Sequence, residues 1–390
     1  MIKLAIITTH PIQYYAPVFR LLHERHQIDI KVFYSWGEAA LNNYDPGFGK
    51  TITWDIPLLE GYPYEWVRNI APAPGSHHFK GIVNPDLVNR INIYKPEAIL
   101  VIGWAYHSHL KVIRYFKNKI PVLFRGDSTL IDEKGGLKSM ARSLFLKWVY
   151  NPIDYAFYNG VNNKAYFKKY GLTESQLIFA PHAIDNERFG LDRTDEALLL
   201  KQSLGLAETD MLVLFAGKLE DKKDPGLLLD AFIALNNPKT HLLLVGNGTL
   251  GSQLKLKAKP YPNIHFIDFQ NQSYMPVIYQ ACDLFCLPSK GPAETWGLAI
   301  NEAMACAKPI LVSDKVGAAA NLVKPGVNGA IFKAGSLTDM MNNLTQLIKG
   351  GKNQLIKMGG HSKELIKDWN FEAQAKAIEA AITNNIFTKK

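Results

Sequence analysis

The chain of 390 residues is long enough for two domains of ordinary size. Hydrophobic residues make up 47% of the sequence and charged residues 20%, which excludes an intrinsically disordered protein. Lys and Arg number 44 against 35 Asp and Glu. The formal net charge of +9 therefore favours an anionic partner, such as a phosphate ligand, a nucleic acid or a membrane surface.

Targeting and redox signals are few. No apolar run approaches the ~18 residues of a membrane-spanning helix, and the three cysteines do not make a disulfide framework. Residues 1–10 are typical of a first β-strand rather than a signal peptide, because their apolar stretch is short. The sequence therefore predicts a cytoplasmic protein, which could also be peripheral on the inner face of the membrane.

Short apolar runs alternate with helical patterns through the first half of the chain. The amphipathic stretch Tyr15–Arg25 predicts the first helix, and residues 42–78, rich in Gly, Pro and aromatics, predict a long loop region. Strands separated by helices are typical of a parallel sheet with helices on both faces. The strands expected here are Leu4–Thr8, Ile28–Tyr34, Ala98–Ile102 and Val122–Arg125.

A second alternating series begins near residue 210, after the polar segment 185–210, which predicts a linker. Its expected strands are Met211–Ala216, His241–Val245, Ile264–Ile267, Leu284–Leu287, Ile310–Val312 and Ala330–Phe332. We therefore predict an α/β protein of two doubly wound, Rossmann-like domains that face each other across a cleft. These domains are residues 1–188 and 189–370, with a C-terminal helix at 371–390 that packs back toward the first domain. Ligands of such sheets bind at the carboxyl ends of the strands.

Two strand ends in the second half carry residues suited to a phosphate ligand. Gly217 lets the backbone approach a ligand closely, and the ammonium groups of Lys218 and Lys223 could neutralise a diphosphate. Gly246 and Asn247 follow the next strand in a Gly-Asn-Gly loop, a weak signal for a phosphate or sugar site. Taken alone, each pattern is more typical of an ordinary turn.

A third strand end is more informative. The strand Leu284–Leu287 is followed by a loop that contains Glu294 and by a helix that contains Glu302. The first N–H groups of this helix lack partners inside it, and its dipole favours an anion. Both acids could accept hydrogen bonds from sugar or ribose hydroxyls; the alternative is a surface acid and an ordinary helix acid. The residues between the loop and the helix are Thr295, Trp296, Gly297 and Leu298.

Residues 211–335 resemble the nucleotide-sugar-binding domain of the family-4 retaining glycosyltransferases, which have the two-domain GT-B fold. The resemblance rests on motifs in the same order along the chain: Gly217-Lys218 with Lys223, Gly246 and Gly248, Glu294 and Glu302 as the E-x7-E motif, and Val323–Gly329. More weakly, Ala180–Phe189 is similar to the stretch that precedes the interdomain linker in that family.

The resemblance implies a role for each matching residue. Lys218 and Lys223 match the basic pair that binds the donor diphosphate, and Glu294 matches the acid that contacts the transferred sugar, which makes these three the catalytic candidates. Glu302 matches the acid that holds the ribose hydroxyls. The remaining donor-binding candidates are Gly217, Gly246, Asn247, Thr295, Trp296, Gly297 and Leu298, of which the last two would offer backbone N–H groups to the diphosphate.

The resemblance also implies an activity. It is retaining, metal-independent hexosyl transfer from a nucleotide-diphosphate sugar, UDP ahead of GDP, to a glycan or lipid-linked acceptor in surface polysaccharide, lipopolysaccharide or glycolipid assembly. The nucleotide sugar is a substrate, so no cofactor and no metal is expected, and the sequence has no Asp-x-Asp pair. The alternatives are a sugar-nucleotide epimerase on the same fold and a nucleic-acid-binding protein, for which no binding motif is found.

Polar residues at two strand ends of the first half are candidates for the acceptor side. His10 and Gln13 follow the first strand, and Arg125 and Asp127 lie at the end of the strand Val122–Arg125. Two alternatives remain open, because His10 could cap its strand and Arg125 could pair with Asp127. Many members of the family carry a histidine near the second of these positions, but Phe124-Arg-Gly-Asp127 stands there and no catalytic histidine is assigned.

The excess of positive charge is concentrated in residues 111–169, with 12 Lys and Arg against 4 Asp and Glu. Within this segment, residues 134–150 mix basic and bulky apolar side chains at helical spacing. Such a helix can lie on an anionic membrane surface. The alternative is a helix that packs on the core and keeps its lysines in water.

Overall fold

The computed structural model describes residues 1–42, 44–45, 49–133 and 135–386, and it divides into two compact units. Unit 1 comprises Met1–Asn43, Ile56–His182 and Phe371–Lys390, and unit 2 comprises Tyr44–Asp55 and Ala183–Asn370. Small parts of the expected loop at 42–78, of the basic segment and of the C-terminal helix therefore lie outside the described residues. The division between the units falls a few residues before the expected boundary at 188.

Unit 1 is built on a seven-stranded parallel sheet with the order β5-β2-β1-β6-β7-β8-β9. Its strands are β1 (Ile2–Thr8), β2 (Ile28–Tyr34), β5 (Tyr64–Trp66), β6 (Ala98–Ile102), β7 (Val122–Arg125), β8 (Tyr155–Tyr158) and β9 (Leu177–Phe179). The α-helices of the unit are α1 (Ala16–Glu24), α2 (Leu87–Tyr94), α3 (His107–Phe116), α4 (Leu137–Tyr150), α5 (Val161–Lys169) and α15 (Phe371–Ala380). Short 3-10 turns η1 (Glu38–Asn42), η2 (Phe79–Gly81) and η3 (Glu174–Gln176) and the final π-helical turn η5 (Ala381–Ile386) complete it.

The strands of unit 1 bury both faces of their sheet. Successive side chains of a strand point to opposite faces, so Leu4 and Ile6 join one apolar cluster while Ala5 and Ile7 join the other. This explains why β1 is a continuous apolar run rather than an alternating one. The four strands expected from the sequence in this half are confirmed.

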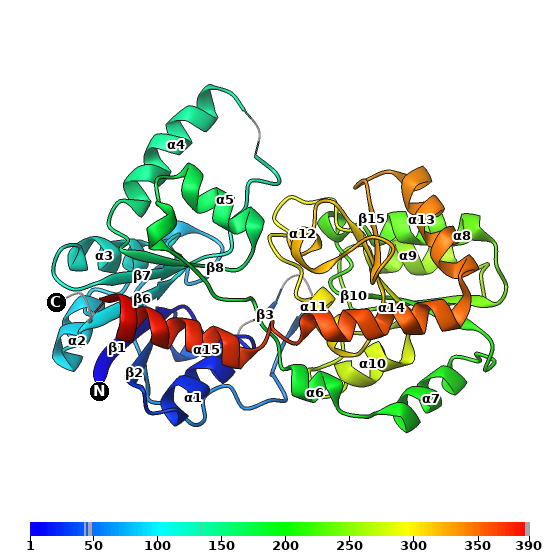
Figure 1. The fold of residues 1–390 in the computed structure, drawn as a ribbon, viewed down its shortest axis with the longest axis horizontal. Helices are drawn as coiled ribbons and strands as arrows, with labels where there is room; N and C mark the ends of the chain where they lie inside the picture. Colours follow the sequence, from blue (N-terminus) through cyan, green and yellow to red (C-terminus); the bar gives the residue numbers. More distant parts are fainter. Residues whose placement is uncertain (43, 46–48, 134, 387–390) are drawn as a thin grey trace. The chain divides into compact units, whose positions relative to one another are not determined.

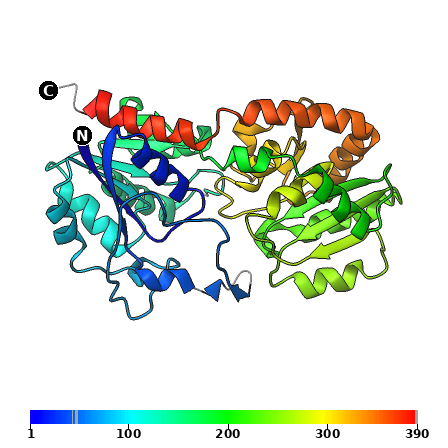
Figure 2. The same cartoon turned by 90° about the horizontal axis from the view of Figure 1, so that it is seen from below.

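The C-terminal helix α15 belongs to unit 1 although it follows unit 2 in the chain (Figures 1 and 2). It lies beside α1, and Ala375 and Ile378 are part of the apolar cluster that covers one face of the sheet. Arg25, next to the end of α1, donates two hydrogen bonds of 2.9 Å to the buried carboxylate of Glu379 and also bonds to Glu372. The helix is therefore an integral part of the core of unit 1.

Unit 2 contains a six-stranded parallel sheet with the order β12-β11-β10-β13-β14-β15. Its strands are β10 (Met211–Ala216), β11 (Thr240–Val245), β12 (Ile264–Ile267), β13 (Leu284–Leu287), β14 (Ile310–Ser313) and β15 (Gly329–Phe332). Its helices are α6 (Asn186–Gly190), α7 (Thr194–Ser203), η4 (Asp221–Lys223), α8 (Pro225–Leu235), α9 (Gly251–Ala258), α10 (Met275–Ala281), α11 (Ala299–Ala305), α12 (Ala319–Leu322), α13 (Leu337–Lys349) and α14 (Gly351–Ile366). The small hairpin β3 (Tyr44–Asp45) and β4 (Lys50–Thr51) also belongs to this unit.

The expectation of two doubly wound α/β domains is confirmed, but the expectation of a linker at 185–210 is wrong. That segment forms α6 and α7 before β10 begins. Asp185 caps α6 by accepting a hydrogen bond from the N–H of Arg188 at 3.0 Å, and Ala197 and Leu200 of α7 are buried. Polar composition is misleading here because only one face of each short helix reaches the core.

Within the described residues, no helix combines the length and the apolar character needed to cross a bilayer. The same residues contain no group of three or more His, Cys, Asp or Glu side chains arranged to hold a metal ion.

Candidate functional site

The candidate donor residues of unit 2 follow strands at the switch point of its sheet. The chain winds from β10 outward to β12 and then returns to β13 on the other side of β10. In open α/β sheets, ligands bind beside the carboxyl ends of the strands at such a point. Gly217 and Lys218 follow β10, and the loop that carries Glu294 follows β13, so the fold brings these positions to one edge of the sheet.

The most specific contact at this edge joins Lys223 to Glu294. The Lys223 Nζ lies 2.5 Å from Glu294 Oε2, and the hydroxyl of Ser289 donates to the same oxygen at 3.0 Å. Only 8% of the Glu294 side chain and 19% of the Lys223 side chain are exposed. A buried ion pair is costly to form unless its two charges are paired with each other or with a ligand.

Two glycine-containing loops pack backbone against backbone at the same edge. The N–H of Gly217 donates to Val245 O, and the N–H of Leu219 donates to Asn247 O, both at 2.9 Å. A β-carbon on Gly246 would stand 2.0 Å from the oxygen of Gly217, and Gly246 has a φ of +134°. Only glycine fits there, so the Gly-Asn-Gly pattern is required for the close approach of two loops.

Asn247 has a structural hydrogen bond of its own. Its side-chain oxygen accepts the N–H of Phe269 at 2.7 Å, which fixes the loop after β12 against the loop after β11. The side chain therefore orders the edge of the sheet, and a contact between Asn247 and a donor stays a prediction.

Helix α11 begins where the sequence places it, with Leu298 as the residue before its first turn. Gly297 has a φ of +91°, and a β-carbon there would meet Val316 Cγ1 at 2.7 Å. The carbonyl of Thr295 is packed against Gly317, which leaves no room for a side chain on that glycine. The turn into α11 is thus held by two glycines, one packed against side chains and one against the backbone of Thr295.

The structure places Glu302 and Trp296 in the interior of unit 2. Glu302 accepts a hydrogen bond of 2.8 Å from the hydroxyl of Tyr279 and is 4% exposed. The ring of Trp296 is stacked on Trp369 at 5.1 Å, and its Nε1 donates to Asn301. The Trp296 side chain packs in the core, and a contact between Trp296 and a donor stays a prediction.

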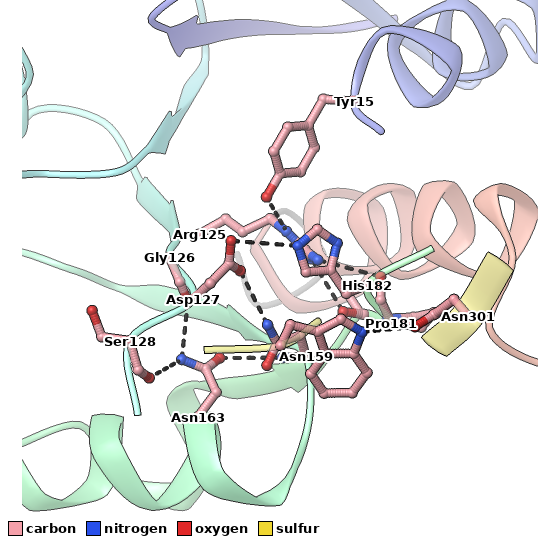
Figure 3. A network of polar contacts seen from close by, with 12 residues as sticks. Tyr15, Arg125, Gly126, Asp127, Ser128, Asn159, Asn163, Pro181, His182 and Asn301 are labelled. Carbon is pink, nitrogen blue, oxygen red and sulfur yellow. Dashed lines mark hydrogen bonds and ion pairs between the residues drawn. The ribbon is translucent and has the colours of Figure 1, made fainter. Parts of the chain in front are cut away.

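In unit 1, a buried polar network lies at the ends of β7, β8 and β9 (Figure 3). Arg125 is 1% exposed, and its guanidinium donates to the hydroxyl of Tyr15 at 3.2 Å and to the carbonyls of Ala180 and Pro181 at 3.1 and 3.3 Å. The hydrogen bonds of Arg125 therefore go to Tyr15 and to two backbone carbonyls rather than to Asp127. Arg125 ties β7 to the segment after β9, and its positive charge favours the ionised form of Asp127.

Asp127 is the acid of this network. Its Oδ1 accepts from Asn159 Nδ2 at 3.1 Å, and its Oδ2 lies 3.5 Å from His182 Nε2. Burial opposes the ionisation of Asp127, but His182, Arg125 and the bond from Asn159 outweigh it and lower the pKa of the carboxyl to about 2. The carboxylate remains 31% exposed, so it is an ionised acceptor of hydrogen bonds that a ligand can reach.

His182 is one of the residues of this network that the sequence did not assign, with Tyr15 and Asn159. It follows β9 within Ala180–Phe189, and its imidazole is stacked on Tyr15 at 6.0 Å and contacts Tyr14 edge-on. Its position after a parallel strand was an available signal, because the carboxyl ends of β7 and β9 meet at one edge of the sheet.

His10 and Gln13 follow β1, away from the hydrogen bonds of that network. Nδ1 of His10 lies 2.9 Å from Thr9 Oγ1, and the ring meets Trp36 edge-on at 5.3 Å. Burial lowers the pKa of His10 to about 4, so the imidazole is neutral near pH 7. Gln13 is partly exposed in the turn before α1.

A cavity of about 500 Å³ in unit 2 lies apart from these residues. It is lined by parts of α6, α7, α10, α11 and α14, and it shares no residue with the strand-end group.

The chain is similar to known proteins both in sequence and in fold. Residues 198–359 match the family model of the glycosyl transferases group 1. A D-inositol 3-phosphate glycosyltransferase of Nocardia farcinica is 23% identical over 335 residues, which cover 78% of this chain and 72% of that protein.

Two solved structures share the fold across the whole chain. HepE of Anabaena, in complex with UDP and glucose, is 17% identical with a TM-score of 0.71, covering 98% of this chain and 100% of HepE. WaaG, a glycosyltransferase involved in lipopolysaccharide biosynthesis, is 14% identical with a TM-score of 0.68, covering 98% and 100%. Residues 198–359 therefore resemble the glycosyl transferases group 1, and the chain shares the GT-B fold of these solved structures.

Proposed function

We propose that the chain is a retaining glycosyltransferase that moves a sugar from a nucleotide-diphosphate sugar, with UDP as the carrier, to an acceptor hydroxyl. The single observation that carries the proposal is the pair of Lys223 and Glu294, a cation and an acid in contact at the switch point of unit 2. An acid in that position suits the hydroxyls of a sugar, and the lysine beside it suits the diphosphate. HepE is described in complex with UDP and glucose, which supports UDP as the carrier.

The chemical task of the site is to stabilise the departing diphosphate. Charge develops on that group as the glycosidic bond breaks, and preorganised cations and N–H groups that point at it lower the barrier. Lys218, Lys223 and the backbone at Gly297 and Leu298 are the groups that would do so here. In the route that we favour, the diphosphate leaves from the same face on which the acceptor arrives and takes the proton of the acceptor hydroxyl, which retains the anomeric configuration.

The proposed reaction needs no metal, because two lysines can supply the positive charge that a cation would otherwise bring. Glu302 is proposed to hold the ribose hydroxyls. The hydrogen bond from Tyr279 fixes the orientation of this carboxylate.

For the acceptor we propose a glycan or a lipid-linked glycan in the assembly of surface polysaccharide or glycolipid. Asp127 is an ionised, partly exposed acid at the carboxyl end of β7, and such a group accepts hydrogen bonds from sugar hydroxyls. His10 and Gln13 are proposed for the same side. The basic segment at 111–169 suits an anionic membrane surface, where acceptors on lipid carriers are found, and the similarity to WaaG agrees with lipopolysaccharide as one setting.

The test is a transfer assay with UDP- and GDP-sugars and a panel of glycan acceptors, with the anomeric configuration of the product read by NMR. We expect transfer from a UDP-sugar, the same anomer in donor and product, and full activity in EDTA. An inverted product would reject the retaining mechanism, and loss of activity in EDTA would reject metal independence. An incubation without acceptor is the control, because conversion of the donor sugar alone would point to an epimerase.

A further inference from the structure

Helix α4 carries apolar side chains on two opposite faces. Leu146, Val149 and Tyr150 are buried in unit 1. Met140 and Leu144 lie one turn apart on the other side, and Trp148 continues their line one turn further on. These three side chains are 66%, 73% and 44% exposed. Packing within the unit accounts for the first face of α4 and leaves the second unexplained.

The exposed face is ordered and extends along most of the helix. Phe145, which is 44% exposed, stacks on Trp148 at 5.7 Å and meets Trp104 edge-on. No residue from 139 to 145 is buried, and Figure 1 shows the first turns of α4 extending away from the sheet of unit 1. We call Met140, Leu144, Phe145 and Trp148 the outer face of α4.

Most of the charges beside this face are positive, although Glu133 lies near enough to act on Arg142 through its charge. Helix α4 contains no Asp or Glu, and Arg142 and Lys147 on it are exposed. From α3, the guanidinium of Arg114 stacks on the ring of Trp148 at 3.9 Å. In the part of the chain that the structure describes, none of these three cations forms an ion pair within 4 Å. The side chain of Lys138 lies outside that part.

The combination selects one occupant. A second copy of the same face would bring like charges together, whereas a bilayer with anionic lipids offers an apolar layer next to a negative surface. Tryptophan and bulky apolar side chains flanked by Lys and Arg are the composition of helices that lie in the membrane interface. We propose that the outer face of α4 inserts into the interface of a bilayer that contains anionic lipid; this deepens the proposed function, on which it rests for the lipid-linked acceptor.

The test measures the partition of the full chain between buffer and vesicles. Vesicles of phosphatidylcholine alone are compared with vesicles that also contain phosphatidylglycerol. We expect binding to the second kind, and we expect Leu144→Ser to lower the partition coefficient by about tenfold because an inserted leucine is lost. The matched control is Leu256→Ser, at a leucine that is 74% exposed on α9 between Lys255 and Lys257 and should change nothing.

A second set of variants, with reversed charges, distinguishes insertion of apolar side chains from electrostatic attraction to the vesicle surface. The double variant Arg142→Glu and Lys147→Glu should lose preference for the anionic vesicles, and Leu144→Ser should remain impaired at high salt, where attraction is screened. Absence of vesicle binding by the unmodified chain, or equal losses in Leu144→Ser and Leu256→Ser, would overturn the proposal. UDP binding measured on the same samples reports on the donor site separately, so failure of membrane binding and failure of the proposed function are distinguishable.

Discussion

Lys223 is the residue whose charge serves two purposes in this structure. Without a donor it balances the buried carboxylate of Glu294 at 2.5 Å, and with a donor it is proposed to meet the diphosphate. Removing it therefore has two separable consequences, one for stability and one for turnover. An acid left buried without its cation raises the free energy of the folded state.

We expect Lys223→Ala to reduce turnover by about 10²-fold or more, as the loss of a preorganised donor does at other sites, and also to lower the melting temperature. Steady-state kinetics and thermal unfolding measure the two effects. Lys222→Ala is the control, because this neighbouring lysine is more exposed and pairs with Glu220 instead. Lys223→Arg should recover stability more than turnover. Unchanged turnover in Lys223→Ala would remove this lysine from the mechanism.

His10 gives the protein a predictable response to acid. Burial lowers its pKa to about 4, below the ~6.5 of an unfolded histidine, so the unfolded chain binds more protons between these values. The stability that His10 contributes is therefore complete above pH 6.5 and is lost as the pH falls toward 4. At pH 5 the loss reaches about 2 kcal/mol.

We expect His10→Gln to reduce the fall in unfolding free energy between pH 7 and pH 5 by up to that amount. Urea unfolding at the two pH values measures it. His77→Gln, at an exposed histidine, should keep the fall seen in the unmodified chain. Equal falls in His10→Gln and in the unmodified chain would mean that His10 takes up no extra proton on unfolding.

At the scale of the elements, the loops after β10 and β11 can pack against each other only because Gly246 has no side chain. Gly246→Ala would put a β-carbon 2.0 Å from Gly217 O at a φ of +134°, and we expect it to destabilise the protein by about 3 kcal/mol or more. Gly226→Ala in α8 is the matched control, because a β-carbon there meets nothing within 4 Å and should stabilise by up to about 1 kcal/mol. Chemical unfolding compares the two. A Gly246→Ala protein as stable as the unmodified chain would contradict the close packing of the loops.

The strands and the loop-to-helix segment that carries Glu294 and Glu302 could be predicted from the sequence, because both depend on local patterns. Continuous apolar runs such as Met211–Ala216 and Leu284–Leu287 are buried on both sides, and a parallel sheet is the structure that buries them. The start of α11 after Gly297 was predictable for a similar reason, since glycine and the following apolar residues mark a helix boundary.

Features that depend on distant residues could not be predicted in this way. The contact between Lys223 and Glu294 joins residues far apart in the chain, and no local pattern fixes its 2.5 Å distance. The ring of Trp296 stacks on Trp369 in the core, a contact that the sequence of the loop alone does not predict. His182 lies near Asp127 because β7 and β9 flank β8 in the sheet, and this strand order cannot be read from a local pattern.

For the molecule as a whole, neither unit is one continuous stretch of chain. Residues 44–55 belong to unit 2, where Asn271 Nδ2 donates to Thr53 O at 2.7 Å and the N–H of Ser273 donates to Asp55 at 3.1 Å. Helix α15 returns the chain to unit 1. A cut at residue 188 would therefore separate each unit from part of itself, and the full chain is the right material for experiments on either unit.

A ligand that binds one unit should raise the melting temperature of the full chain, and the size of the rise should distinguish UDP from GDP and uridine. A ligand that binds only the folded state adds RT ln(1 + [L]/Kd), about 2.7 kcal/mol at a hundredfold excess over Kd. We expect UDP to raise the melting temperature in proportion to the logarithm of its concentration and GDP to raise it less. Uridine should have little effect because it lacks the diphosphate that Lys218 and Lys223 are proposed to bind. Lys223→Ala should abolish the shift, whereas Asp127→Asn in unit 1 should keep it. If uridine stabilised the chain as strongly as UDP, the assignment of these lysines to the diphosphate would fail.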